Sequence, residues 1–152
     1  MDWTIDRRRA LAIGAASAAT AALGGLPALA QGGNDHKELI AKFTGGKTAA
    51  PGLVKLDLPE IAENGNTVPM VLTVDSPMTA ASHVSDVLVV ADGNPRGGIA
   101  TFHFTPAGGV AEASTRIRLG ATQNVIAVAK LSDGSFHMAS RQVKVTIGGC
   151  GG

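Results

Sequence analysis

The sequence predicts an all-β protein: an immunoglobulin-like antiparallel β-sandwich of about seven strands, with a short N-terminal helix and a glycine-rich C-terminal arm. Three observations support this prediction. Most apolar segments alternate with polar residues at a period of two, as half-buried strands do. Turn residues separate these segments at short intervals, with no helical pattern between them. The last five residues, 148–152, read Gly-Gly-Cys-Gly-Gly and follow directly on the final apolar segment.

The first thirty residues have the pattern of an export signal. Three arginines at 7–9 precede a weakly apolar run rich in Ala and Gly, which ends in Ala28-Leu29-Ala30. Paired arginines before such a run, with small residues at the cleavage position, indicate a twin-arginine-type signal peptide over residues 1–30. A membrane anchor is the alternative, but the Ala and Gly content makes a poor bilayer span. We therefore expect cleavage after Ala30 and a periplasmic mature chain with a domain over 31–147 and no membrane association.

Composition limits the function classes for a chain of 152 residues, which has room for one ordinary domain. The net charge is +1, and no basic run follows residue 9, so nucleic-acid binding through a phosphate-tracking patch is not expected. Residues 1–30 hold three Arg and two Asp, so cleavage would leave ten basic and ten acidic residues. Cys150 is the one cysteine of the sequence, which excludes an intramolecular disulfide.

A short helix is expected at the start of the mature chain, over Asp35–Phe43. Asp35 with Glu38 three residues later resembles a capping box, and Gly45-Gly46 would end the helix. Its apolar face would be made of Leu39, Ile40 and Phe43.

Seven later segments are predicted to be strands: 54–58, 68–74, 87–91, 99–104, 111–119, 125–131 and 136–147. The clearest two-residue period lies in 111–119, and the connection 59–66 is rich in turn residues. Ser132-Asp133-Gly134 predicts a hairpin turn between the last two strands. The final strand changes the parity of its apolar residues midway, which predicts a β-bulge near Ser140.

The arm 148–152 places a thiol on a thin tether. Glycine accepts φ of either sign and adds no side chain, so we expect a flexible arm and an exposed Cys150. A nucleophilic cysteine needs a nearby base or a helix N-terminus, yet the nearest basic residue, Lys144, is six positions back. The sequence therefore predicts a carrier that presents its thiol to other active sites, and not an enzyme.

Two alternatives to a carrier remain open. A copper site on the sandwich would draw on His36, His83, His103 and His137 with Met70, Met78 and Met138. A blue-copper site needs its cysteine in a firm loop with a histidine close behind, whereas Cys150 is followed by two glycines. We therefore expect no metal and no cofactor, with surface histidines and methionines that fill the core. The second alternative is a periplasmic interaction module whose Cys150 forms an intermolecular disulfide.

The chain resembles the SoxY family, the sulfur-carrier subunits of the bacterial Sox thiosulfate-oxidising system. The resemblance covers nearly all of the expected mature chain, and the terminal pentapeptide is its most specific part. Its residues are Leu58–Gly65 (LPEIAENG), Val68-Pro69, Ser76-Pro77-Met78, Asn94-Pro95, Arg116–Leu119, Ala121–Ala129, Val143–Thr146 and Gly148–Gly152.

The resemblance implies a specific role and specific partners. Members of the family pair with SoxZ, a second small β-sandwich, and hold sulfur covalently on the arm cysteine, here Cys150. The c-type haem protein SoxAX joins thiosulfate to that thiol, the hydrolase SoxB releases sulfate, and in many systems SoxCD oxidises the remaining sulfane sulfur. The arm glycines that would let Cys150 enter successive active sites are Gly148, Gly149, Gly151 and Gly152.

Overall fold

The protein is represented by a computed structural model in which residues 33–149 are described. Residues from Gly33 onward belong to one compact unit. The expected signal peptide, residues 1–30, lies outside the described residues, so its cleavage stays a prediction.

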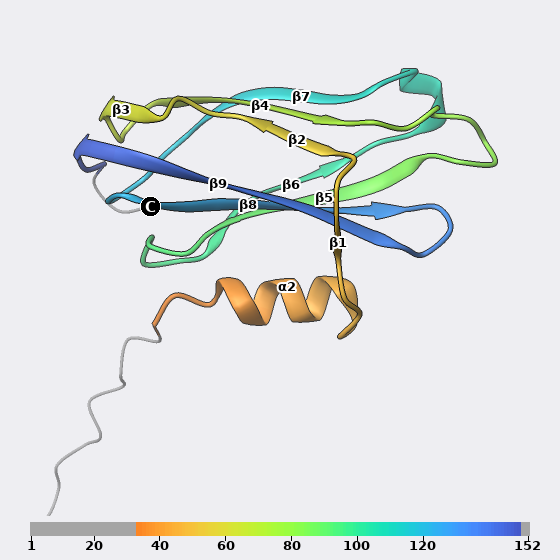
Figure 1. The fold of residues 1–152 in the computed structure, drawn as a ribbon, viewed down its shortest axis with the longest axis horizontal. Coiled ribbons are helices and arrows are strands. Elements are labelled where there is room, and N and C mark those ends of the chain that lie inside the picture. Colours follow the sequence, from red (N-terminus) through yellow and green to blue (C-terminus); the bar gives the residue numbers. More distant parts are fainter. Residues whose placement is uncertain (1–32, 150–152) are drawn as a thin grey trace, which may run out of the picture. The chain divides into compact units, whose positions relative to one another are not determined.

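Two sheets face each other in the described part of the chain (Figure 1). The smaller sheet has the order β2-β4-β7, formed by β2 (Val54–Asp57), β4 (Val68–Val74) and β7 (Ala111–Ile117), all antiparallel. The larger sheet has the order β1-β9-β8-β5-β6, and β3 also pairs with β9. Its strands are β1 (Ala50–Pro51), β3 (Ile61–Asn64), β5 (Val84–Ala91), β6 (Gly98–His103), β8 (Gln123–Leu131) and β9 (Phe136–Ile147). The predicted antiparallel β-sandwich is thus confirmed.

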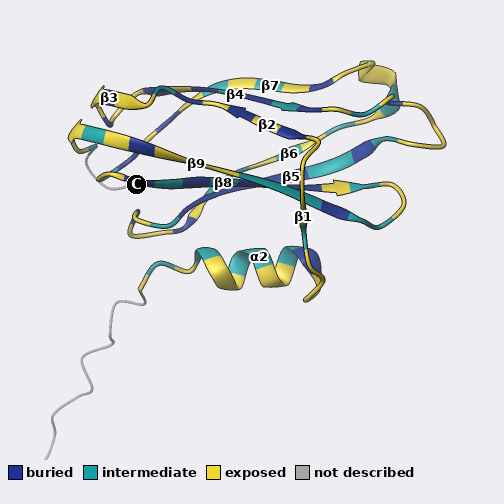
Figure 2. Cartoon of the chain, in the orientation of Figure 1, coloured by how far each residue is buried: buried dark blue, intermediate teal, exposed yellow. Residues whose placement is uncertain are grey.

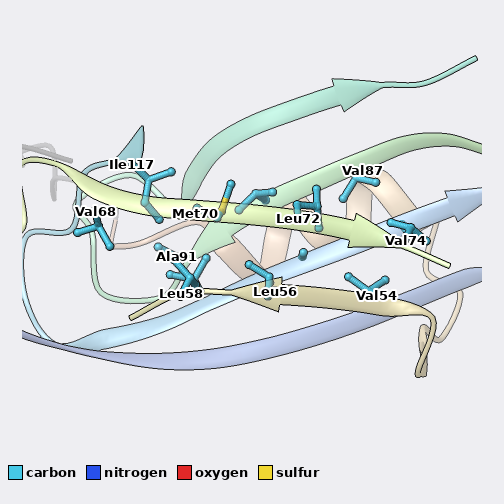
Figure 3. Close-up of a cluster of buried hydrophobic side chains, with 14 of the residues drawn as sticks. Val54, Leu56, Leu58, Val68, Met70, Leu72, Val74, Val87, Ala91 and Ile117 are labelled. Atoms are coloured by element: carbon cyan, nitrogen blue, oxygen red, sulfur yellow. The ribbon is translucent and has the colours of Figure 1, made fainter. Parts of the chain in front are cut away.

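The core lies between the sheets because alternate residues of each strand point inward. In β4 the burial pattern alternates strictly, and Met70 and Leu72 are almost fully shielded from solvent. Figure 3 shows these side chains on β4, together with Val68 and Val74 of the same strand and Val54 and Leu56 of the neighbouring β2. On β5 the inward residues are Val87, Val89 and Ala91. The core between the sheets is therefore mainly an aliphatic layer to which both sheets contribute.

Helix α2 (His36–Thr44) covers the outer face of the larger sheet, on the side away from β2, β4 and β7 (Figures 1 and 2). The helix ends as expected at Gly45, which is left-handed with φ 62°. Asp35 is the N-cap residue, but its carboxylate makes no capping bond and accepts instead from the Gly97 N–H at 2.7 Å. The aspartate therefore ties the helix start to the β5–β6 connection. A single 3₁₀ turn, η1 (Pro106–Gly108), joins β6 to β7. Neither of these helices has the length and hydropathy that a membrane crossing needs.

The predicted bulge near Ser140 is wrong, because β8 and β9 keep one unbroken register from Gln123↔Val143 to Lys130↔Phe136. The parity change has a different cause. Val143 belongs to the core between the sheets, whereas Phe136 faces the helix and stacks edge-on against Phe43 at 5.9 Å. The first half of β9 thus buries the face that packs on the helix, and the second half buries the face that packs on the smaller sheet.

Two strands were not expected from the sequence, β1 and β3, and both pair with β9 in parallel. Segment 59–66, expected to be turn, holds β3, whose burial does not alternate. The predicted hairpin is confirmed: the N–H groups of Leu131 and Gly134 bond to the carbonyls of Ser135 and Leu131, and Gly134 has φ 81°.

Candidate functional site

The candidate site is the end of the sandwich from which the arm leaves, and β9 is fixed on both sides up to that end. On one edge, β3 pairs with its last residues through Ile61↔Lys144 and Asn64↔Ile147. On the other edge β8 begins opposite Val143, and beyond it the Thr122 hydroxyl accepts the Val145 N–H at 3.0 Å. The arm therefore starts from a strand whose final residues have bonded neighbours.

Three chain segments meet where the arm begins, linked by main-chain hydrogen bonds. The Gly65 N–H donates to the Ile147 carbonyl at 2.8 Å, and the Leu119 N–H donates to the Gly65 carbonyl at 2.8 Å. The Gly149 N–H then donates to the Leu119 carbonyl at 2.9 Å. We call Gly65 and the Leu119-Gly120 pair the arm notch. Its backbone contacts the first two residues of the arm and hydrogen-bonds the second, Gly149.

The arm notch is built from close backbone approaches that only glycine allows. A Cβ at Gly65 would come closer than 3.0 Å to the Leu119 oxygen, the Gly149 nitrogen and a Val145 methyl. A Cβ at Gly148 would overlap the Gly120 carbonyl oxygen, and one at Gly149 would lie 2.9 Å from the Gly65 oxygen. Gly148 and Gly149 thus have a steric reason to be glycine, in addition to the flexibility predicted from sequence, which stays a prediction.

A buried asparagine shapes the arm notch from behind. Asn94 is 3% exposed, and its Nδ2 donates to the Arg118 carbonyl at 2.9 Å while its Oδ1 accepts the Gly120 N–H at 2.9 Å. The Gln123 Nε2 donates to the same Oδ1 at 2.7 Å, and the Gln123 Oε1 accepts the Gly93 N–H. The sequence marked Asn94-Pro95 only as part of a family resemblance. A polar residue three positions after a buried strand was the available signal, but its partners lie in the β7–β8 loop and at the start of β8.

Two exposed apolar side chains lie on β3 and β9, the strand pair that leads to the arm. Ile61 on β3 is 58% exposed and Ile147 at the end of β9 is 66% exposed. Ile147 directly precedes the arm, whereas Ile61 pairs with Lys144, three residues earlier on β9. They give this end of the sandwich apolar surface beside an otherwise main-chain site.

The arm cysteine, Cys150, follows Gly149 directly and lies outside the described residues, as do Gly151 and Gly152. Its exposure and its role as the sulfur attachment point therefore stay predictions. The structure contributes the position and the bonding of the chain that leads to it.

The candidate copper ligands are dispersed over the described residues. Met70 and Met78 lie in the core, and the Met78 sulfur accepts the Val84 N–H at 3.5 Å. His103 is on β6, with its Nδ1 2.5 Å from the Asp86 carboxylate. Burial would raise the pKa of Asp86, but hydrogen bonds from Ser85 and His103 outweigh it and lower that pKa. Residues 33–149 contain no group of three or more His, Asp or Glu side chains placed to hold a metal ion.

Comparison with known families gives a match that spans the sandwich. The sequence model of the family described as "Sulfur oxidation protein SoxY" matches residues 40–150, which is most of the chain and includes Cys150. The chain belongs to the SoxY family. The resemblance inferred from the sequence is thereby confirmed. A search among curated proteins gave no match.

Solved structures agree with membership of the SoxY family. The sulfur carrier protein SoxY from Chlorobium limicola f thiosulfatophilum is 28% identical, with a TM-score of 0.61 over 71% of this chain and 89% of that one. A superoxide reductase (neelaredoxin) from Ignicoccus hospitalis is 16% identical, with a TM-score of 0.56 over 62% of this chain and 80% of that one. A putative superoxide reductase from Thermotoga maritima is 19% identical, with a TM-score of 0.52 over 68% and 89% of the two chains. At those identities the reductases share the fold alone.

Proposed function

We propose that this SoxY-family chain is a periplasmic sulfur carrier that holds thiosulfate-derived intermediates covalently on Cys150 and presents them to partner enzymes. The observation that carries the proposal is the family match, which runs through the sandwich and ends at the only cysteine of the sequence. The likeness to a solved sulfur carrier protein, at 28% identity, supports it further.

The geometry of the arm notch supports a carrier over an enzyme. The atoms that hold Gly149 are main-chain atoms of Leu119, and those nearest Gly148 belong to the backbone of Gly120. A catalytic thiol needs a base held within hydrogen-bond reach, and a backbone site does not supply one. Activation of the thiol is then the task of the enzymes that receive the arm.

The chemistry of loading and release balances without a cofactor on this chain. Loading joins the Cys150 sulfur to the sulfane sulfur of thiosulfate, releases the thiol proton, and passes two electrons to an oxidant, by resemblance the c-type haem of SoxAX. Hydrolysis then breaks the bond between the sulfane sulfur and the sulfone, with water supplying the oxygen of the departing sulfate, and leaves a persulfide on Cys150. By the same resemblance SoxB performs the hydrolysis, SoxCD oxidises the persulfide where it is present, and SoxZ is the heterodimer partner.

Intact-mass measurement of the reduced chain, incubated with thiosulfate and the haem partner, tests the proposal. We expect a mass increase of one thiosulfate unit that a reductant removes and that Cys150→Ser abolishes. Adduct formation on the Cys150→Ser variant would refute the proposal. Disulfide-linked pairs of chains, with no thiosulfate-dependent mass change, would instead support an interaction module.

A further inference from the structure

The arm notch implies that part of the arm is anchored. β9 ends at Ile147, yet two further residues keep specific neighbours: Gly148 lies against Gly120, and Gly149 bonds to Leu119. Two residues of extended chain span about 7 Å. Whether those residues are held or free therefore changes the reach of the thiol by that amount.

The anchoring carbonyl belongs to the loop between β7 and β8, in which the Leu119 side chain is buried in the core. Leu119 lies between β7, which ends at Ile117, and β8, which begins at Gln123. Its N–H bonds to Gly65, but the orientation of its carbonyl depends on the peptides on either side. Asn94 bonds to both neighbours, accepting from the Gly120 N–H and donating to the Arg118 carbonyl.

We propose that Asn94 is a positioning residue for the carrier arm. By bridging Arg118 and Gly120 it directs the Leu119 carbonyl at Gly149, so that the arm leaves the sandwich after Gly149 and not at the end of β9. The inference rests on the proposed function for its consequence, since the anchor sets the point from which Cys150 is presented. The anchor itself is a property of residues 65–149.

Three features make Asn94 suited to this role. An amide side chain both donates and accepts, which a bridge between a carbonyl and an N–H requires. The residue is buried, so water does not compete for these bonds. Its Oδ1 also accepts from Gln123 at the start of β8, which fixes the amide orientation. Loss of Asn94 would leave the Gly120 N–H and the Arg118 carbonyl free to turn.

Amide hydrogen exchange, followed residue by residue by NMR on the full reduced chain, tests the inference. In the parent protein we expect the Gly149 amide to exchange at least about tenfold more slowly than in an open glycine peptide, because it is hydrogen-bonded. In Asn94→Ala, the Gly149 amide should lose that protection. The exchange rates of the amides in the β8–β9 ladder should change only as far as the global stability of the protein changes. The matched control is Asn34→Ala, which removes the hydrogen bonds to the Ala91 and Asn94 carbonyls and the two that the Asn34 Oδ1 makes with His36. It removes none to Arg118 or Gly120.

A second variant keeps the test decisive if Asn94→Ala does not fold. Gly148→Ala places a methyl group against the Gly120 carbonyl and acts from the arm side, so the sandwich keeps its own contacts. We expect the Gly149 amide to lose its protection at unchanged unfolding free energy. Protection of the Gly149 amide retained in a folded Asn94→Ala would overturn the positioning role of Asn94. An unprotected Gly149 in the parent protein, or protection retained in Gly148→Ala, would overturn the anchor on which that role depends. Sulfur loading is measured separately by mass, so an anchored arm that accepts no sulfur would reject the proposed function and leave the anchor standing.

Discussion

Gly65 is the most constrained position of the arm notch, and replacing it with alanine tests the steric reasoning. The added Cβ would come closer than 3.0 Å to three atoms on two other segments: the Leu119 oxygen, the Gly149 nitrogen and a Val145 methyl. Two of these are backbone atoms, which cannot rotate away as a side chain does. Forcing a methyl group into such a site costs about 1–3 kcal/mol. Separation of the segments would also weaken the two hydrogen bonds of Gly65, to Ile147 and Leu119, at roughly 0.5–1.5 kcal/mol each.

We therefore expect Gly65→Ala to lower the free energy of unfolding by about 2–4 kcal/mol, with the melting temperature down by roughly 10 °C. Urea denaturation followed by circular dichroism measures the change. The matched control is Gly108→Ala, because a Cβ there meets no atom within 4 Å and its φ is ordinary. The control should stay within about 0.5 kcal/mol of the parent. A Gly65→Ala protein as stable as the control would show that the arm notch is not closely packed.

Two further predictions concern the helix and one carboxylate. Phe43→Ala removes the ring that packs on Phe136 and should lower the free energy of unfolding, measured by urea denaturation, by about 1–3 kcal/mol. The control is Lys42→Ala at an exposed position of the same turn, which should change that free energy little. Equal effects would mean that α2 does not pack on the sheet through this ring. Burial would raise the pKa of Asp92, but bonds from the Asn124 N–H and side-chain amide outweigh it and lower that pKa. Because the folded pKa lies below the unfolded one, this stabilisation is complete above about pH 5 and is lost as the pH falls through the folded value. Asp92→Asn should therefore flatten the decline of unfolding free energy between about pH 5 and pH 2, and an unchanged slope would argue against the bond.

The sequence predicts those strands whose burial follows their own alternation. In 68–74 the apolar residues occupy every second position, and the structure buries those same positions. β3 was missed because Ile61–Asn64 carries no alternation and exists only through its parallel partner, β9, far along the chain. The false bulge in β9 has a related cause. The alternation of apolar residues along a strand indicates which one of its faces is buried. A strand that is covered by a helix on one side and by a second sheet on the other has two buried faces, so its apolar residues can change parity without a bulge.

The candidate site divides in the same way. The sequence alone predicts a carrier role for the terminal Gly-Gly-Cys-Gly-Gly, because a lone thiol among glycines has few structural uses, and that role stays a prediction. Its anchor could not. Gly65 sits in Asn64-Gly65-Asn66, which is typical of a turn that needs a permissive backbone, but the structure requires glycine there because two other segments approach it. Likewise, no spacing in the sequence links Asn94 to Gly120, since the two meet only once both loops are placed by the sheets.

The hydrogen bonding of β9 has a mechanical consequence for the proposed presentation of the arm to partner enzymes. Under the proposed function, a pull on the arm by a partner enzyme would act along β9, which is bonded lengthwise to β8 on one side and, at its arm end, to β3 on the other. Tension in that direction shears many parallel bonds at once, so no single bond bears the load alone, as it would if the strand were peeled from its edge. The sandwich is therefore expected to stay folded when force is applied repeatedly to the arm.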